Sequence, residues 1–187
     1  MELHLIRHTP VELKNNICYG RIDVPLSNSF VSDCENIKKK LSKNYDIVFI
    51  SPSKRCVELA KKLGYKTFIT DEKLLELNFG DWEGKEWDKI NQKQLNKWMK
   101  KFVNVAPPNG ESFINMFNRI QTFIENLRVE KYNKVLIITH SGVIRCFLAK
   151  ILEFPLENSF KLPIGFNEHY VIKLSSDATF DSLLKLK

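Results

Sequence analysis

Short apolar runs alternate with longer amphipathic stretches along this chain. Five runs are predicted strands because most are rich in β-branched residues and too short for helices: Leu3–Ile6, Ile47–Ile50, Lys66–Ile69, Val135–Thr139 and Tyr170–Leu174. Between them, apolar residues spaced three or four apart predict helices over Val31–Ser42, Lys54–Leu63, Phe113–Arg128 and Val143–Leu152. Strands that alternate with helices predict an α/β fold with a mainly parallel sheet.

The stretch from Asp81 to Asn109 has a different composition. It contains all three tryptophans among many lysines and asparagines, and it leads into the turn at 107–110. We expect one or two amphipathic helices here, lying over the domain. No repeat or linker divides the 187 residues, a length that suits one domain, so we expect a single domain over residues 1–187.

The net charge of +7 raises the question of a polyanionic partner. Lysines supply most of the positive charge and are dispersed, with short runs only at 38–40 and 100–101. No nucleic-acid-binding module is evident, so we expect no nucleic-acid partner. The six arginines are more informative, because the guanidinium group is the preferred bidentate ligand for phosphate and carboxylate.

Signals for a membrane or for export are weak. The first residues lack a basic segment followed by a long apolar one, and no apolar run approaches the ~20 residues of a membrane span. The four cysteines form no CxxC pair. We therefore expect a cytoplasmic protein with free thiols, no membrane partner, and a monomeric or homodimeric state.

Two histidines follow predicted strands directly. Arg7 and His8 come after the first strand, and His140 comes after the fourth. Arg55 falls in the first turn of the helix that follows the second strand. Ligands collect at the carboxyl ends of strands in open α/β sheets, and helix N-termini attract anions. The pattern predicts a cationic crevice that binds an anion.

A single histidine at a strand end is more often a surface or core residue than a catalytic one, so only the joint pattern carries weight. A zinc site on His8 and His140 would need a third ligand, and no His, Cys or Asp cluster has suitable spacing. We expect no metal and no cofactor. His4 and His169 lie within or at the start of strands and are expected to be structural.

A proton donor would have to come from another part of the chain. Glu76 lies between apolar residues ahead of a glycine-flanked turn, and apolar surroundings keep a carboxyl group protonated and ready to donate. Asp81 and Glu83 are competitors whose turn setting favours exposure. Position alone favours Glu76 only modestly.

Five motifs are spread over nearly the whole chain: residues 5–9 (LIRHT), 51–56 (SPSKRC), 74–84 (LLELNFGDWEG), 108–112 (PNGES) and 139–142 (THSG). In content and order they together resemble the histidine phosphatase superfamily, also called the phosphoglycerate mutase-like family. The resemblance implies a three-layer sandwich in which helices flank the central sheet, as in phosphoglycerate mutase.

The resemblance also implies a role for each matched residue. His8 would be the nucleophile that becomes phosphohistidine, and Glu76 would be the acid that protonates the leaving group and then activates water. The phosphoryl group would be clamped by Arg7, Arg55 and His140, with His140 acting as a cation in the presence of phosphate. Further contacts to substrate are expected from Thr9, Tyr19 and Ser141. A backbone carbonyl is the expected partner that orients His8.

Within the superfamily, residues 7–11, 18–27 and 79–90 resemble the α-ribazole phosphatases of late cobalamin synthesis. This resemblance implies a metal-independent phosphomonoesterase acting on α-ribazole 5′-phosphate, a small phosphate ester. Departures at Phe30, Asp33 and Glu58-Leu59 leave every catalytic position filled but weaken inference about the leaving group. A broad-specificity sugar or nucleotide phosphatase and a phosphoglycerate mutase-like enzyme remain alternatives. A basic nucleic-acid-binding protein and an inactive scaffold are remote ones.

Overall fold

A six-stranded mixed sheet forms the centre of the protein. The computed structural model describes residues 1–13 and 16–185. The strands lie in the order β3-β2-β4-β1-β5-β6, with the bounds β1 Glu2–Arg7, β2 Ile47–Ile50, β3 Ile69–Thr70, β4 Lys134–Thr139, β5 His169–Lys173 and β6 Ser182–Lys185. Strands β3, β2, β4 and β1 are parallel, while β5 and β6 are antiparallel to their neighbours. The prediction of a mainly parallel sheet is confirmed.

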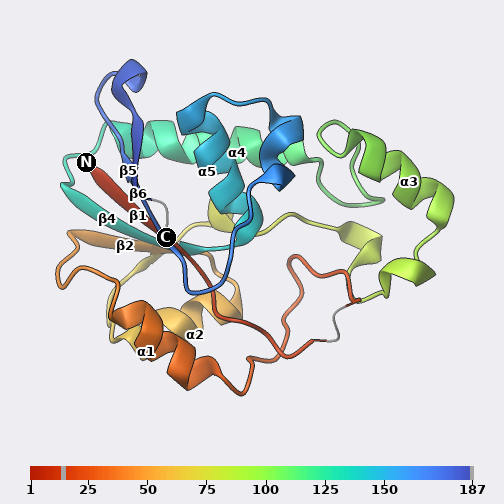
Figure 1. Ribbon diagram of the computed structural model, residues 1–187, viewed down its shortest axis with the longest axis horizontal. Helices are drawn as coiled ribbons and strands as arrows, with labels where there is room; N and C mark the ends of the chain where they lie inside the picture. Colours follow the sequence, from red (N-terminus) through yellow and green to blue (C-terminus); the bar gives the residue numbers. More distant parts are fainter. Residues whose placement is uncertain (14–15, 186–187) are drawn as a thin grey trace.

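Helices cover both faces of the sheet. Helices α1 (Phe30–Lys38) and α2 (Lys54–Leu63) lie on one face, and α4 (Phe113–Arg128) and α5 (Ser141–Leu152) lie on the other (Figure 1). Alternate residues of β4 serve the two layers. Leu136 and Ile138 pack towards α1 and α2, whereas Val135 and Ile137 pack towards α4 and α5. The three-layer sandwich implied by the sequence is confirmed.

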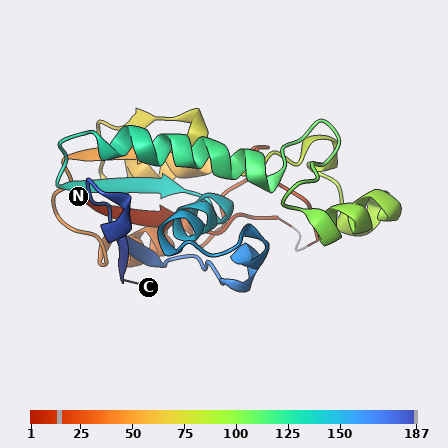
Figure 2. The same cartoon turned by 90° about the horizontal axis from the view of Figure 1, so that it is seen from above.

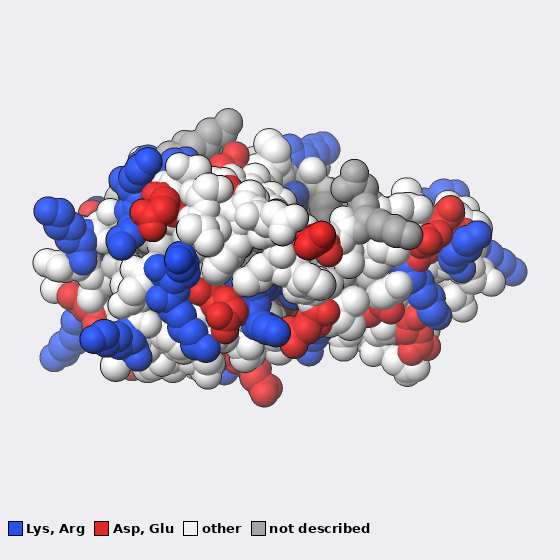
Figure 3. Space-filling model, turned by 90° about the horizontal axis from the view of Figure 1, so that it is seen from below, with Lys and Arg blue, Asp and Glu red and all other residues white. Residues whose placement is uncertain are grey.

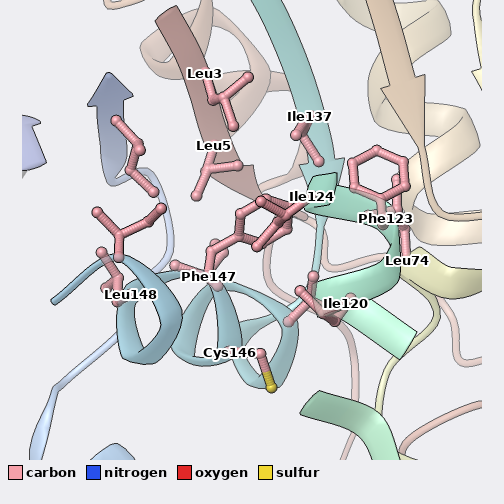
Figure 4. Packing of buried hydrophobic residues seen from close by; sticks show 14 of the residues in the cluster. Leu3, Leu5, Leu74, Ile120, Phe123, Ile124, Ile137, Cys146, Phe147 and Leu148 are labelled. Carbon is pink, nitrogen blue, oxygen red and sulfur yellow. The ribbon is translucent and has the colours of Figure 1, made fainter. Parts of the chain in front are cut away.

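The larger core lies between the sheet and the pair α4–α5. Leu3 and Leu5 of β1 meet Phe147 of α5 and Ile120 and Phe123 of α4 (Figure 4). Phe147 is fully buried and its ring lies 6.1 Å from that of Phe123. This packing fixes α5 against β1 and β4, so that the N-terminus of α5 has a defined position at the end of the sheet.

Most of the predicted elements are found with small shifts at their ends. Two helices have the predicted bounds, whereas α1 ends four residues early and α5 begins two residues early, at Ser141. The strand predicted over Lys66–Ile69 is wrong in position. Only Ile69 and Thr70 pair with β2, at the exposed edge of the sheet. The edge strand β6 was not predicted, because Ser182–Lys185 shows no clear alternation.

The tryptophan-rich stretch contains helix α3 (Gln92–Lys101) and two short 3₁₀ turns, Gly80–Trp82 and Trp87–Lys89. It projects beyond the end of the sheet rather than lying over a sheet face (Figure 2). Its own small core contains Cys18, Trp82, Ile90 and Leu95. The predicted helix is present, but the predicted position over the domain is wrong.

The dispersed charge expected from the sequence is visible on the surface. Lysine and arginine side chains are interleaved with acidic ones on the face shown in Figure 3. None of the helices in the described part of the chain combines the length and apolar character that a bilayer crossing requires. All four cysteines are buried and unpaired by disulfides.

Candidate active site

The two strand-end histidines lie next to each other because β1 and β4 are neighbouring parallel strands in register. Arg7 is paired with Thr139, so the following residues, His8 and His140, emerge side by side. The His8 amide donates to the Thr139 carbonyl at 2.9 Å. Their ring centroids are 5.1 Å apart at an interplanar angle of 63°. The register of the sheet therefore builds the centre of the site.

A cavity of about 290 Å³ opens beside the His8 ring, and His140 lies outside its lining. Six residues singled out from the sequence line it: Arg7, His8, Tyr19, Arg55, Glu76 and Ser141. Its remaining wall is mostly apolar and aromatic, formed by Ile17, Leu77, Phe79, Trp87, Phe113 and Phe160. Gly142 and Arg145 complete the lining. The cavity lining thus combines cationic and acidic side chains with aromatic ones.

His8 is held in one tautomer. Its Nδ1 lies 2.7 Å from the backbone carbonyl oxygen of Thr9, which can only accept, so Nδ1 carries the proton and donates. Nε2 is then left with its lone pair. Burial, reinforced by Arg55 and Arg7, holds the pKa of His8 well below its usual range. The imidazole is therefore neutral and nucleophilic at Nε2, and the orienting partner is a backbone carbonyl as expected.

Arg7 is positioned by the loop that precedes β5. It donates to the Ile164 carbonyl at 2.8 Å, and its guanidinium carbon lies 3.7 Å from the centroid of the Phe166 ring. That loop is tied to α1 by a hydrogen bond from Asn167 Nδ2 to Asp33 Oδ1 at 2.9 Å. The departure from the family pattern at Asp33 therefore helps to fix the loop that carries Phe166.

Arg55 comes from the first turn of α2, and its side chain is only 1% exposed. It donates to the carbonyl oxygens of Gly20 and Ile22 and, at 3.2 Å, to His140 Nδ1. Nε2 of His140 lies 2.8 Å from Ser51 Oγ. Because Nδ1 of His140 accepts from Arg55, Nε2 carries the ring proton and donates to Ser51.

The charge state of His140 follows from these surroundings. Burial, then Arg55, His8 and Arg7, hold its pKa well below the usual range. His140 is therefore neutral in these surroundings. The cationic form expected from the sequence would need the negative charge of a bound phosphoryl group.

Two arginines that line the cavity each have a buried nitrogen that the protein leaves unpaired. Among the described residues, Arg7 Nε and Arg55 Nε are buried and have no hydrogen-bond partner. Buried N–H donors are almost always paired in folded proteins. An anion with several oxygen acceptors would supply the partners that the protein lacks.

Glu76 lines the same cavity as His8 and the two arginines. It comes from the segment that follows the short turn Glu72–Leu74. Its Oε1 accepts from the amide of Leu77 at 3.0 Å, and its Oε2 accepts from the amide of Gly142 at 3.2 Å and the hydroxyl of Ser141 at 3.4 Å. A Cβ at position 142 would lie 2.3 Å from Oε1, so only glycine leaves room for this carboxyl group. The side chain is held by polar donors rather than by the apolar surroundings expected from the sequence.

The competing carboxylates have other partners. Asp81 is exposed and accepts from Asn109 Nδ2 at 3.1 Å. Glu83 is half-buried, contrary to the expected exposure, because it accepts from the backbone amides of Phe79, Arg21 and Ile22. Neither carboxylate lines the cavity. The geometry therefore favours Glu76 among the three.

The three residues expected to contact substrate have different positions. Tyr19 lines the cavity, with its ring 5.7 Å from the guanidinium carbon of Arg55. Ser141 lines it as well and donates to Glu76. Thr9 is fully buried and lies outside the cavity lining. It contributes to the site through its backbone carbonyl, which accepts from His8.

Sequence reasoning missed several lining residues. Arg145 lies one turn after Ser141 on α5, donates to the Ser159 carbonyl and rests 5.0 Å from the centroid of the Phe160 ring. The spacing of four from Ser141 is the signal that could have placed it in the site. Of the tryptophans, only Trp87 lines the cavity, whereas Trp82 is buried in the small core. In the part of the chain that the structure describes, no three His, Cys, Asp or Glu side chains are gathered as metal ligands.

Comparison with known families identifies the chain. The family model described as histidine phosphatase superfamily (branch 1) matches residues 3–184. The chain belongs to this superfamily. The family expected from the sequence motifs is confirmed, and with it the phosphatase class of the enzyme.

The relatives of this histidine phosphatase are named for different substrates. An adenosylcobalamin/alpha-ribazole phosphatase of Escherichia coli is 26% identical over 166 residues, covering 84% of this chain and 82% of the relative. Phosphoserine phosphatase 1 of Hydrogenobacter thermophilus is 25% identical over 162 residues, covering 81% and 76%. The solved structure of the alpha-ribazole phosphatase from Shigella flexneri has a TM-score of 0.90 at 24% identity, covering 100% of this chain and 96% of that one. The last comparison establishes the same fold.

Proposed function

We propose that this histidine phosphatase is a phosphomonoesterase that forms a phosphohistidine on His8 and needs no metal ion. One observation carries the proposal: a neutral, oriented imidazole, two arginines with buried Nε atoms that have no partner, and a held carboxyl group line one cavity. Each of these groups matches a requirement of phosphoryl transfer. The reaction divides into two displacements at phosphorus, which is easier than a single direct attack by water.

In the first displacement, Nε2 of His8 forms a bond to phosphorus while the ester P–O bond breaks. The carboxyl group of Glu76 gives its proton to the departing alkoxide, which leaves as the alcohol. In the second displacement, the Glu76 carboxylate takes a proton from water, whose oxygen attacks phosphorus. The P–N bond then breaks, inorganic phosphate leaves, and His8 and Glu76 return to their starting protonation states.

Charge stabilisation comes from the side chains at the strand ends. The transition state spreads negative charge over three equatorial oxygens. Arg7 and Arg55 have buried Nε–H groups without partners, and these would donate to two of the oxygens. The family resemblance gives His140 the role of a third phosphate ligand, and a cationic His140 would have to exchange the hydrogen bond that its Nδ1 accepts from Arg55 for one that it donates to the phosphoryl group. Donors fixed before the reaction need little reorganisation during it.

The substrate we favour is α-ribazole 5′-phosphate, in cobalamin synthesis. Support comes from the subfamily motifs of the sequence, from the names of two relatives, and from the aromatic side of the cavity. α-Ribazole is a ribose that carries a planar aromatic base. Trp87, Phe79 and Phe160 offer rings against which such a base could stack.

A second candidate substrate, phosphoserine, is favoured by Arg145. This half-buried guanidinium lines the cavity, and among the described residues it has no Asp or Glu within 4.0 Å. Burial lowers its pKa, which indicates a charge without full compensation. A carboxylate beside the ester would compensate it, and so, more weakly, would ribose hydroxyls.

A rate comparison decides between these substrates. We expect kcat/KM for α-ribazole 5′-phosphate to exceed the values for phosphoserine, 3-phosphoglycerate and glucose 6-phosphate by about tenfold or more, with excess chelator present throughout. Comparable values on all four would indicate a broad-specificity phosphatase. Phosphoserine as the best substrate would support the second candidate, and dependence on added metal would contradict the mechanism.

The remaining expectations belong to the same proposal. A single small phosphate ester would be the partner, in a cytoplasmic monomer or homodimer without nucleic-acid or membrane partners. The dispersed, interleaved surface charge supports this view, because extended polyanion sites need clustered basic residues (Figure 3).

A further inference from the structure

Arg21, Glu111 and Arg119 form an ionic triad that contacts the main chain of the candidate acid, Glu76. Glu111 accepts from Arg119 through both oxygens, Oε1 from Nε at 2.7 Å and Oε2 from NH2 at 3.0 Å, and its Oε2 also accepts from Arg21 NH2 at 3.2 Å. The Glu111 side chain is 13% exposed and that of Arg119 is 17% exposed. None of the three residues lines the cavity, so they do not reach a bound substrate.

Both arginines of this triad also hold the main chain of Glu76. Its carbonyl oxygen accepts from Arg21 Nε at 3.2 Å and from Arg119 NH2 at 3.3 Å. Arg119 donates in addition to the carbonyl of Lys73, just before the same segment. Two guanidinium groups thus hold the carbonyl group of residue 76.

The side chain of Glu76 is held by a separate set of donors, from Leu77, Ser141 and Gly142. These contacts fix its carboxyl group only if the backbone from which it projects has a fixed position. Glu111 contacts both of the arginines that donate to the residue-76 carbonyl, so its link to the carboxyl group runs through them.

Close backbone packing brings Glu111 to this place. The Glu111 amide donates to the Asn78 carbonyl at 2.8 Å. A Cβ on Gly110 would lie 2.6 Å from the same carbonyl oxygen, and a Cβ on Gly80 would lie 2.1 Å from the Pro108 carbonyl oxygen. The two segments approach so closely that only glycine fits at either point. The register between residues 78–81 and 108–111 is therefore fixed.

We infer that Arg21, Glu111 and Arg119 form a positioning triad that fixes the proton-donating carboxyl group of Glu76 relative to the ester. The inference rests on the proposed function, because it takes Glu76 as the acid. Weakening the triad leaves His8, Arg7 and Arg55 in place and impairs proton transfer to the leaving group. The loss of rate should therefore be larger for esters whose leaving group needs a proton in order to depart.

The test measures kcat/KM of Glu111→Gln on two esters. p-Nitrophenyl phosphate releases an acidic phenol that departs with little help from an acid, whereas an alkyl phosphate such as β-glycerophosphate releases a basic alkoxide. We expect a loss of about 10- to 100-fold on the alkyl ester, a fraction of a full general-acid contribution, and about threefold or less on the aryl ester. Arg21→Gln, at a more exposed position, should show the same selectivity if Glu111→Gln folds poorly.

Two controls separate positioning from general damage. Glu125→Gln makes the same chemical change on α4, at a carboxylate paired with Arg128 and Lys150 away from the site, and should leave both rates unchanged. In a Glu76→Gln background, Glu111→Gln should add no further selective loss, because the two residues act through one step.

Equal losses on both esters, or a selective loss that persists in the Glu76→Gln background, would overturn the triad's role. A wild-type protein that hydrolyses neither ester would instead contradict the proposed function itself.

Discussion

Two pairs of neighbouring histidines lie within or directly after strands of the same sheet, and of the four only His8 lines the cavity. The rings of His8 and His140 are 5.1 Å apart, and those of His4 and His169 are 4.8 Å apart. All four side chains are buried, and burial lowers the pKa of each. Proximity, burial and a lowered pKa are therefore shared by both pairs and do not distinguish a site from a core.

The surroundings of the two pairs differ. His4 Nδ1 faces the hydroxyl of Tyr45 at 3.0 Å and Nε2 of His169 at 2.9 Å, and neither residue lines the cavity. The other pair lies at the strand ends, where Arg7 and Arg55 enter and the cavity opens. A histidine pair becomes a candidate site when fixed cations and open space join it, and both follow from its place at the carboxyl end of the sheet.

Among variants that keep His8, removing Arg55 should cause the largest loss of catalytic activity. Arg55→Met should lower kcat/KM for p-nitrophenyl phosphate by about 10² to 10³-fold, since it removes donors aimed at the transition-state charge. Steady-state rates at neutral pH measure this loss.

A matched control is available in Arg128, an arginine with a 9% exposed side chain that does not line the cavity. Arg128 pairs with Asp181 at 2.8 Å and with Glu125 at 3.0 Å. Arg128→Met should lower the thermal midpoint of unfolding and leave kcat/KM unchanged. If both variants lost activity to the same extent, the cations would be acting on the fold rather than on the reaction.

His4 and His169 should contribute to the pH dependence of folding stability rather than to catalysis. Burial lowers the pKa of His169 to about 4 and also lowers that of His4. Between an unfolded pKa near 6.5 and the folded value, the unfolded chain binds more protons. The stability from keeping His169 neutral is therefore complete above about pH 6.5 and lost as the pH falls towards 4, by on the order of 2–3 kcal/mol.

Urea unfolding at pH 7 and pH 5 measures this pH dependence. The wild type should lose unfolding free energy at pH 5, and His169→Gln should lose less, because it removes one titrating group. An identical pH dependence in the variant would show that His169 is not kept neutral by the fold.

The sequence predicted the parts of the site that depend on strands. Arg7, His8 and His140 follow apolar runs directly, and Arg55 opens a helix, so the rule for strand ends places all four together without knowledge of any loop. Glu76 is different, because spacing alone left Asp81 and Glu83 as competitors. The structure favours Glu76 through contacts to Gly142 and Ser141, which are 65 residues or more away in the chain.

The apolar and aromatic part of the cavity lining could not be predicted from the sequence, because it also depends on contacts between distant segments. Ile17, Trp87 and Phe160 come from three separate segments whose approach depends on tertiary packing rather than on periodicity. Bridges such as that between Ile17 and Glu86 leave no pattern along the chain. The position of α3 beyond the sheet likewise follows from the small core around Trp82 and Leu95.

The central claim, that His8 alone among the four histidines becomes phosphorylated, can be tested by trapping. Brief incubation with ³²P-labelled substrate, an alkaline quench and peptide mapping should place an acid-labile, alkali-stable label on the peptide that contains His8. His4→Ala should retain the label, and His8→Ala should lose both the label and turnover. A label that persists in His8→Ala, or turnover without any labelled histidine, would contradict the account.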